Sequence, residues 1–205
     1  FEKIIYSTKL MKSIIALEGL PCSGKTEFFE KFKTSGVEMF FIPELYMDAR
    51  DKVNAKDARA LYTEAEKDKF KKVPKNAHTI LCDRSYISTL GFSYAYGKTF
   101  WEYSTYDYNT KFFSTNHDAI LVPTHVIVFR IPPEESLRRS TEKGRTEDVA
   151  YWQNIQFLSN FAAFYESDLL KTLIKSKIIF VDALNIHPEQ VYGQVDQSIR
   201  QYIRK

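Results

Sequence analysis

The feature that most constrains the fold is a glycine-rich stretch near the N-terminus, where residues 19–26 read G-x-x-x-x-G-K-T. The apolar segment 12–18 before it has the composition of a buried strand, and residues 26–32 after it have that of a helix. Strand, glycine loop and helix in this order are what a phosphate-binding loop (P-loop) requires. We therefore expect consecutive backbone N–H groups of the loop to point at phosphate oxygens.

Several residues of the loop have distinct expected roles. Gly19 and Gly24 let the backbone turn tightly. Lys25 can bridge the β- and γ-phosphates, and the Thr26 hydroxyl can bind Mg²⁺. The residues predicted to hold the nucleotide are Gly19, Leu20, Pro21, Cys22, Ser23, Gly24, Lys25 and Thr26. The sequence thus predicts a triphosphate cradle.

Length and composition indicate one ordinary α/β domain. The chain has 205 residues, of which 44% are hydrophobic and 27% charged. Met11 directly precedes the first strand, so we expect residues 1–11 to be an N-terminal extension or a segment added upstream, and 12–205 to be the domain. The net charge of +3 is weak, two cysteines suggest no disulfide framework, and no apolar run spans a membrane. We expect a cytoplasmic protein with neither nucleic-acid nor membrane partners.

A glutamate follows the second predicted strand. The apolar run 37–42 is bounded by Gly36 and Pro43, and Glu44 comes next. Ligands of parallel α/β sheets lie beyond the carboxyl ends of the strands, so Glu44 is placed to face the phosphate site. It can act as a general base for a sugar hydroxyl, or position that hydroxyl. Alternatively, it is a helix N-terminal carboxylate with no role in catalysis.

An aspartate and an arginine close the third predicted strand, residues 79–82. Asp83 has the position of a Walker B aspartate, which holds Mg²⁺ directly or through water. Arg84 has a planar guanidinium that suits phosphate or carboxylate groups of an acceptor. The alternative is a structural ion pair. Asp83 and Thr26 are therefore the predicted metal ligands.

Two further segments are expected to cover the site. Residues 51–75 have apolar positions at helical spacing, including Phe70, and lysines between 67 and 72 that predict a solvated face. Residues 91–113 hold many aromatic side chains, which more often form core but together make an apolar pocket wall plausible.

A basic segment follows the fourth predicted strand, residues 124–131. Pro133 begins a helix that ends in a basic, glycine-interrupted stretch. Its cations can close over the triphosphate and neutralise charge in the transition state, or simply satisfy the helix dipole. The arginines predicted to form this lid are Arg138, Arg139 and Arg145.

The remaining chain completes an alternation of strands and helices. Apolar residues from 149 to 169 predict one long amphipathic helix, residues 178–181 a fifth strand, and Pro188 the start of a last helix. The sequence therefore predicts an α/β P-loop fold, with a five-stranded parallel sheet flanked by helices and a short basic lid.

Together these motifs resemble the thymidylate kinase and deoxynucleoside kinase superfamily of P-loop kinases. The resemblance rests on residues 15–19 leading into the loop, on 83–94 (D-R-S-Y-I-S-T-L-G-F-S-Y) and on 131–139 followed by Gly144-Arg145. It implies an enzyme that uses ATP and Mg²⁺ to phosphorylate a small nucleoside or nucleotide in nucleotide biosynthesis, with Arg84 meeting the acceptor. It also implies a possible homodimer.

The two branches of the superfamily predict different acceptors. Thymidylate kinases usually carry an acidic residue in the loop and Arg-Glu-Pro after the second strand, whereas this chain has Leu20 to Ser23 and Pro43-Glu44. Deoxynucleoside kinases place a lone glutamate there and an acidic residue before Arg-Ser, as Glu44 and residues 83–85 do. The short stretch between Glu44 and Arg84 resembles thymidylate kinases instead.

We consider three functions. The leading hypothesis is ATP- and Mg²⁺-dependent phosphoryl transfer to a nucleoside monophosphate, dTMP or a related pyrimidine deoxynucleotide, whose ionised phosphate needs no base. The second is a deoxynucleoside kinase in which Glu44 takes the proton of the 5′-hydroxyl. The third is a P-loop kinase of another small molecule, or a nucleotide-dependent regulatory module.

Overall fold

Five parallel strands form one sheet at the centre of the computed structural model, which describes residues 13–44, 55–144, 150–184 and 186–203. The strand order is β2-β3-β1-β4-β5. The strands are β1 (Ser13–Gly19), β2 (Phe40–Ile42), β3 (Thr79–Asp83), β4 (His125–Arg130) and β5 (Lys177–Asp182). This confirms the predicted five-stranded parallel sheet. The second strand is shorter than the sequence suggested, since pairing with β3 begins only at Phe40.

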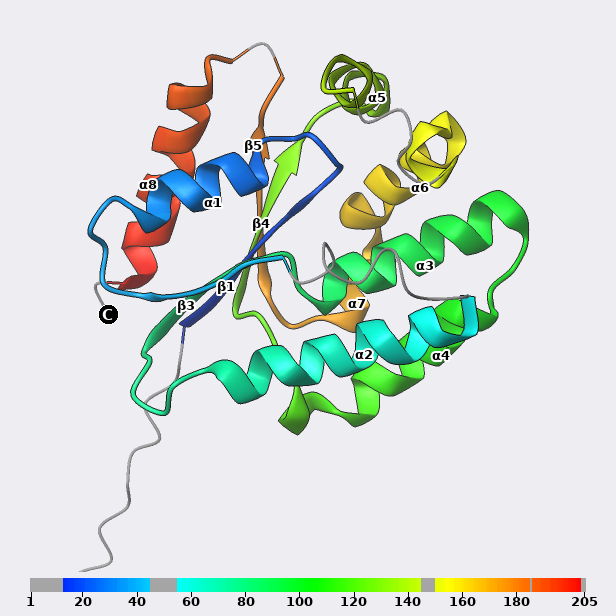
Figure 1. The fold of residues 1–205 in the computed structure, drawn as a ribbon, viewed down its shortest axis with the longest axis horizontal. Coiled ribbons are helices and arrows are strands. Elements are labelled where there is room, and N and C mark those ends of the chain that lie inside the picture. The colour runs from blue at the N-terminus through cyan, green and yellow to red at the C-terminus, as the bar shows by residue number, and fades with distance from the viewer. Residues whose placement is uncertain (1–12, 45–54, 145–149, 185, 204–205) are drawn as a thin grey trace, which may run out of the picture.

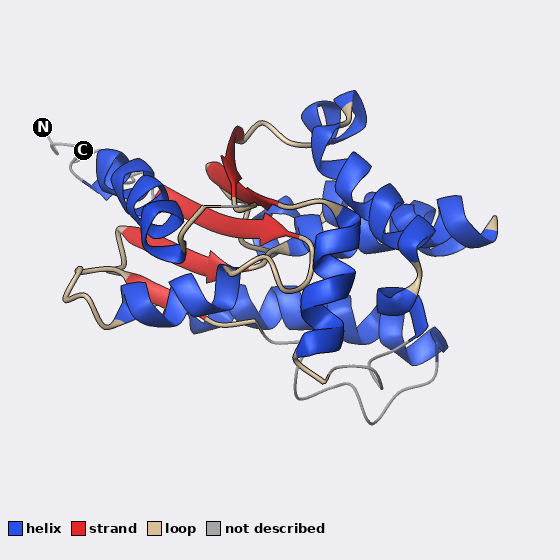
Figure 2. Ribbon diagram, turned by 90° about the horizontal axis from the view of Figure 1, so that it is seen from above, coloured by secondary structure: helices blue, strands red, loops and turns tan. Residues whose placement is uncertain are grey.

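Helices cover both faces of the sheet, with α1 and α8 on one face and α2, α3, α4 and α6 on the other (Figure 1). The helices are α1 (Lys25–Lys33), α2 (Ala55–Lys72), α3 (Tyr86–Phe100), α4 (Ser104–Thr115), α5 (Pro133–Glu142), α6 (Ile155–Glu166), α7 (Asp168–Leu173) and α8 (Pro188–Ile203). In the described residues, two short 3₁₀ turns span His117–Ala119 and Ala150–Gln153. On one side the helices extend well beyond the strands (Figure 2). No helix of the described ranges is long and apolar enough to cross a membrane.

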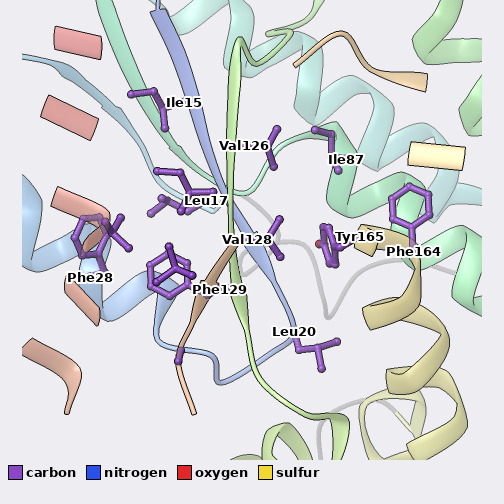
Figure 3. Close-up of a cluster of buried hydrophobic side chains, with 14 of the residues drawn as sticks. Ile15, Leu17, Leu20, Phe28, Ile87, Val126, Val128, Phe129, Phe164 and Tyr165 are labelled. Carbon is purple, nitrogen blue, oxygen red and sulfur yellow. The ribbon is translucent and has the colours of Figure 1, made fainter. Parts of the chain in front are cut away.

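Alternating side chains of the strands build two apolar layers. Figure 3 shows Val126 and Val128 of β4 on the side of Ile87 and Tyr165, and Phe129 on the opposite side with Phe28. All six side chains are buried. Each large apolar side chain buried in this way stabilises the fold by about 1.5–3 kcal/mol. The core therefore fixes the sheet between its helices and leaves the carboxyl ends of the strands free to form a site.

The predicted long helix over 149–169 is wrong in one respect, because the structure divides it into a 3₁₀ turn, α6 and α7. The side chain of Asn154 accepts a hydrogen bond from the Phe157 N–H at 3.1 Å, and that of Ser167 accepts one from the Leu170 N–H at 3.2 Å. These are N-cap bonds, which start a new helix at each position. The apolar periodicity continues across both breaks, so it concealed them.

Gly19 ends β1 in a conformation and a space that only glycine accepts. Its φ is +130°, and a Cβ atom there would lie 2.4 Å from the carbonyl oxygen of Phe129 on β4. The close approach follows from the pairing of Gly19 with Phe129. The sheet therefore sets where the phosphate-binding loop departs.

Candidate active site

The predicted nucleotide-binding loop joins β1 to α1, and its lysine is folded back onto it. The Lys25 ammonium donates to the carbonyl oxygens of Gly19 at 3.1 Å and Leu20 at 2.7 Å, and to the Ser23 hydroxyl at 3.0 Å. Burial, followed by the positive charge of Arg84, lowers the pKa of Lys25 to about 7. The lysine is therefore held at the loop by neutral acceptors, in the place where phosphate oxygens would bring negative charge.

Asp83 ends β3 beside the loop. The register pairs Leu17 with Asp83, which brings the aspartate next to the end of β1. Its carboxylate is buried, and neither oxygen accepts a hydrogen bond of standard geometry among the described residues. Burial raises the pKa of Asp83, against the positive charge of Lys25 and a contact with the Thr26 side chain. A buried carboxylate with so few donors is suited to a cation.

The donor set fits Mg²⁺ bound together with a nucleotide. Thr26, the other predicted ligand, lies in the first turn of α1 with its side chain exposed. The described part of the chain contains no group of three or more His, Cys, Asp or Glu residues that would hold a metal by themselves. Mg²⁺ is commonly held by one or two protein oxygens plus substrate phosphates, and Asp83 and Thr26 match that pattern.

Arg84 and Glu44 form an ion pair beside the loop. The distance from Arg84 Nε to Glu44 Oε1 is 2.8 Å, and Arg84 Nη1 also donates to the Gly19 carbonyl at 3.1 Å. The two side chains are 9% and 23% exposed, so the pair lies largely out of water but remains reachable. The structure thus brings together three residues that the sequence singled out separately.

The backbone of Arg84 is left-handed, with φ of 65°, which is uncommon for a residue other than glycine. Its N–H donates to the carbonyl of Leu17 at 3.0 Å, and its own carbonyl accepts from the Lys69 ammonium at 3.3 Å. Both bonds hold the strained turn between β3 and α3. They direct the guanidinium back over the loop.

The prediction that the lysines of residues 67–72 form a solvated face is wrong for Lys69. Lys69 is 1% exposed and pairs with the fully buried Glu66 at 2.8 Å. Phe70, which was placed on the apolar face, is 44% exposed. The buried positions of this part of α2 are Thr63, Glu66 and Lys69. Their spacing is helical but their chemistry is polar, because this face of α2 turns towards the site rather than towards the apolar core.

Glu18 is a buried residue of the site that sequence reasoning missed. It ends β1 one position before Gly19 and is fully buried. Its carboxylate accepts hydrogen bonds from the Ser85 N–H at 2.9 Å, from the Ser85 hydroxyl at 2.7 Å and from the Tyr165 hydroxyl at 3.1 Å, and also from the Ser88 hydroxyl. The available signal was a single charged residue in an otherwise apolar buried strand, since a buried carboxylate requires donors.

The structure separates the predicted lid arginines. Arg139 of α5 reaches the loop, since Nη1 lies 3.4 Å from the Cys22 carbonyl and Nη2 lies 3.1 Å from that of Ala183. Arg138 is 55% exposed and pairs with Glu135 at 2.7 Å and with Glu142. Hydrogen bonds from both arginines lower the pKa of Glu135 to about 2. Arg145 lies outside the described residues.

Helix α5 touches the loop at a second point. The Ser136 hydroxyl donates to the carbonyl of Pro21 at 2.8 Å. Together with Arg139, this places the start of the predicted lid helix on the outer side of the phosphate-binding loop. Of the lid residues in the described part of the chain, Arg139 alone contacts that loop.

Comparison of the fold with solved structures finds many matches, two of which are described here. Both are structures of deoxyadenosine kinase from M. mycoides, one with the products dCMP and a flexible dCDP bound and the other with bound dATP. The first has a TM-score of 0.69 at 17% identity and covers 92% of this chain and 99% of that one. The second has a TM-score of 0.70 at 18% identity and covers 91% and 99%. The chain has the fold of a deoxyadenosine kinase.

The kinase fold and the predicted resemblance agree. The P-loop kinase architecture expected from residues 19–26, 83–85 and 131–145 is confirmed across nine-tenths of the chain. Neither a family model nor a curated protein matches the sequence.

Proposed function

We propose that this protein is an ATP-dependent deoxynucleoside kinase, in which Glu44 takes the proton from the 5′-hydroxyl of the acceptor. The observation that carries the proposal is the ion pair of Glu44 with Arg84, 2.8 Å long, beside the carbonyl of Gly19 in the loop. Arg84 holds Glu44 at the mouth of the phosphate-binding loop and favours its ionised form. A base in that position is needed only when the acceptor is a neutral hydroxyl.

The proposal assigns a role to each neighbouring residue. Backbone N–H groups of the loop and the Lys25 ammonium bind the phosphates of ATP, since phosphoryl transfer depends on positioning and charge stabilisation. Asp83 and Thr26 would hold Mg²⁺, which when bound neutralises charge on the phosphates. We assign the approach to the transferred group to Arg139, because it touches the loop from α5. The kinase fold shared with deoxyadenosine kinase supports this assignment.

The monophosphate kinase hypothesis has less support from the geometry. A monophosphate acceptor requires a cation for its phosphate, and Arg84 is the residue that the sequence offered. Its guanidinium is already engaged by Glu44, the Gly19 carbonyl and the Ser88 hydroxyl. The matched deoxyadenosine kinase structures also favour a nucleoside acceptor.

Glu44→Gln separates the two functions. ADP release is measured with MgATP and a panel of deoxynucleosides and their monophosphates. The substitution is expected to lower nucleoside phosphorylation by about 10²–10⁴-fold, because the amide cannot accept the proton. Glu38→Gln is the matched control, since Glu38 is exposed and lies before β2 at the other end of that strand. It is expected to leave the rate unchanged.

Three other results would count against the proposal. Full nucleoside turnover by the Glu44→Gln variant would remove Glu44 as the base. Turnover confined to a monophosphate, and insensitive to Glu44→Gln, would restore the nucleotide kinase hypothesis. If no acceptor of the panel supported ADP release although MgATP still bound, the substrate would have to be another small molecule, or the protein would have a nucleotide-dependent regulatory role.

A further inference from the structure

A buried hydrogen-bond network lies behind the Glu44–Arg84 pair, and the proposed mechanism does not use it. Its centre is Glu18, whose carboxylate is fully buried between the end of β1, the first turns of α3 and helix α6. Tyr165, the α6 member, points towards Val128 and Ile87 in the core (Figure 3). Burying a carboxylate is costly unless donors hydrogen-bond to it. The same hydrogen bonds also hold those donors in place.

Ser88 connects this network to Arg84. The Ser88 hydroxyl donates to Glu18 Oε2, and Arg84 Nη1 lies 3.1 Å from the same oxygen atom of Ser88. A hydroxyl has one proton to donate and two lone pairs to accept with. When the proton goes to Glu18, both lone pairs stay available, and the carboxylate charge strengthens the serine oxygen as an acceptor for Arg84. The hydrogen bonds thus run from Arg84 through Ser88 to Glu18.

The Arg84 guanidinium is consequently fixed at three points. Nε pairs with Glu44, while Nη1 donates to the carbonyl of Gly19 and to the hydroxyl of Ser88. The Gly19 contact belongs to the loop, where the same carbonyl also accepts from the Lys25 ammonium. Ser88 lies on α3 and is tied to Glu18 in the core, so it is the contact that does not depend on the loop.

We propose that Ser88, supported by Glu18, is a positioning residue that orients the Arg84 guanidinium towards Glu44. The inference rests on the proposed function, because it takes Glu44 as the base. Neither Ser88 nor Glu18 contacts the reacting groups; both act through Arg84. Losing the Ser88 hydroxyl frees the guanidinium to turn away from Glu44 and leaves the carboxylate of Glu44 less stabilised.

A substitution at Ser88 leaves the charged groups around the pair in place but removes a hydrogen bond from two of them. Among the described residues, the charged and titratable groups that face Arg84 and Glu44 come from β1, α1, α2, β3 and α6 and are Glu18, Lys25, Lys69, Asp83 and Tyr165. The Ser88 hydroxyl lowers the pKa of Glu18 and of Tyr165, so its loss raises both. A change in the pH dependence of the rate then reports the loosened network of Arg84, Ser88 and Glu18.

Ser88→Ala is tested with a deoxynucleoside acceptor that the wild-type enzyme turns over. The variant is expected to lower kcat about tenfold or more, with the KM for ATP unchanged, and to move the acidic limb of the pH profile of kcat to higher pH. The limb moves upward because a less stabilised Glu44 carboxylate is protonated at higher pH. Ser93→Ala is the control, since the buried Ser93 hydroxyl on the same helix bonds, within the described ranges, to the α3 carbonyls of Thr89 and Leu90.

Ser88→Cys is the second variant, because it fills the same space with a weak donor and acceptor and keeps the test open if Ser88→Ala does not fold. Rates and a pH limb equal to those of Ser93→Ala would overturn the inference, and so would a lower rate with an unmoved limb. Glu44→Gln, measured in parallel, separates the two proposals. If it retains turnover, the proposed function fails; if it is inactive while Ser88→Ala matches the control, only the positioning role fails.

Discussion

At the scale of single residues, Lys25 of the loop is the side chain whose charge state should respond most to a bound ligand. Lys25 is 4% exposed, and its ammonium is satisfied by two carbonyls and one hydroxyl of its own loop. These neutral acceptors do not replace the solvation of a full charge, so burial lowers its pKa to about 7. Binding a polyanion removes this penalty.

We therefore expect MgATP binding to be accompanied by proton uptake at pH 8. Lys25 is largely deprotonated there in the ligand-free protein and becomes protonated beside the phosphates. Isothermal titration calorimetry in two buffers of different ionisation enthalpy measures the uptake, which should approach one proton and disappear at pH 6. Lys25→Arg, whose guanidinium stays protonated at either pH, should bind without uptake. Absence of uptake by the wild-type protein at pH 8 would contradict the inferred state of Lys25.

The residue scale also shows what could be predicted from the sequence. The loop, Asp83, Arg84 and Glu44 could be selected because each follows a strand, and strand ends share one edge of a parallel sheet. The ion pair between Arg84 and Glu44 could not, because it depends on a left-handed turn at a residue that is not glycine. Lys69 could not either, since charge at a helical position ordinarily indicates solvent.

At the scale of elements, α3 is the helix on which the site depends. It starts at Tyr86, two residues after Arg84, and Ser85 caps it by accepting from the Ile87 N–H at 3.2 Å. The same Ser85 hydroxyl donates to Glu18. Helix α3 packs closely on α6 at Gly91, where an added Cβ would lie 2.4 Å from a ring carbon of Phe161 and 2.8 Å from one of Phe164.

Gly91→Ala is expected to destabilise the protein by about 1–2 kcal/mol. Overpacking costs about 1–3 kcal/mol, and alanine's better helix propensity offsets up to about 1 kcal/mol of it. The rings cannot move aside easily because both phenylalanines are buried. Gly193→Ala in α8 is the matched control. A Cβ there meets nothing within 4 Å, so the control should gain up to about 1 kcal/mol from propensity alone. Urea unfolding measures both, and equal shifts would contradict the packing account.

Helices and strands were predicted well where the apolar periodicity and the residues that start or end elements agreed, and poorly where they did not. The predicted strands at 12–18, 79–82 and 124–131 lie within a residue of the ends of β1, β3 and β4. The region 149–169 failed because its apolar spacing stays helical while Asn154 and Ser167 cap new helices. A side chain that caps a helix and one that sits on a helix surface are not distinguishable by spacing alone.

At the scale of the whole molecule, burial of the apolar core offsets the free-energy cost of burying charged side chains at one edge of the sheet. Within the described residues, six buried Asp, Glu, Lys and Arg side chains gather around the ends of β1 and β3: Glu18, Lys25, Glu66, Lys69, Asp83 and Arg84. Most have partners, but the Asp83 carboxylate accepts no hydrogen bond of standard geometry in the described part of the chain. Burying an ionised group without partners is unfavourable, so the ligand-free protein is less stable than its core alone would make it.

The sign of this effect follows from the raised pKa of Asp83. The folded state binds the proton more tightly than the unfolded chain, so stability contributed by this group falls as pH rises from the unfolded pKa of about 4 through the folded value. At pH 8 the buried carboxylate is therefore a net cost. A cation bound to Asp83 would reverse that cost, which links global stability to the proposed Mg²⁺ site.

Asp83→Asn should consequently separate stability from binding. Without ligands at pH 8 the variant is expected to melt about 2–6 °C higher than wild type, because a neutral amide is cheaper to bury than a charge. The wild-type protein should gain more thermal stability from ATP with Mg²⁺ than from ATP with a chelator, and the variant should show no such difference. Asp182→Asn is the matched control, since Asp182 also ends a strand but is 59% exposed and pairs with Arg130 at 2.6 Å. It should neither melt higher nor lose the Mg²⁺ increment. Two results would contradict this account: an Asp83→Asn protein that melts lower than wild type without ligands, or one that keeps the full Mg²⁺ increment. Either would show that this carboxylate is not the cation ligand that its burial indicates.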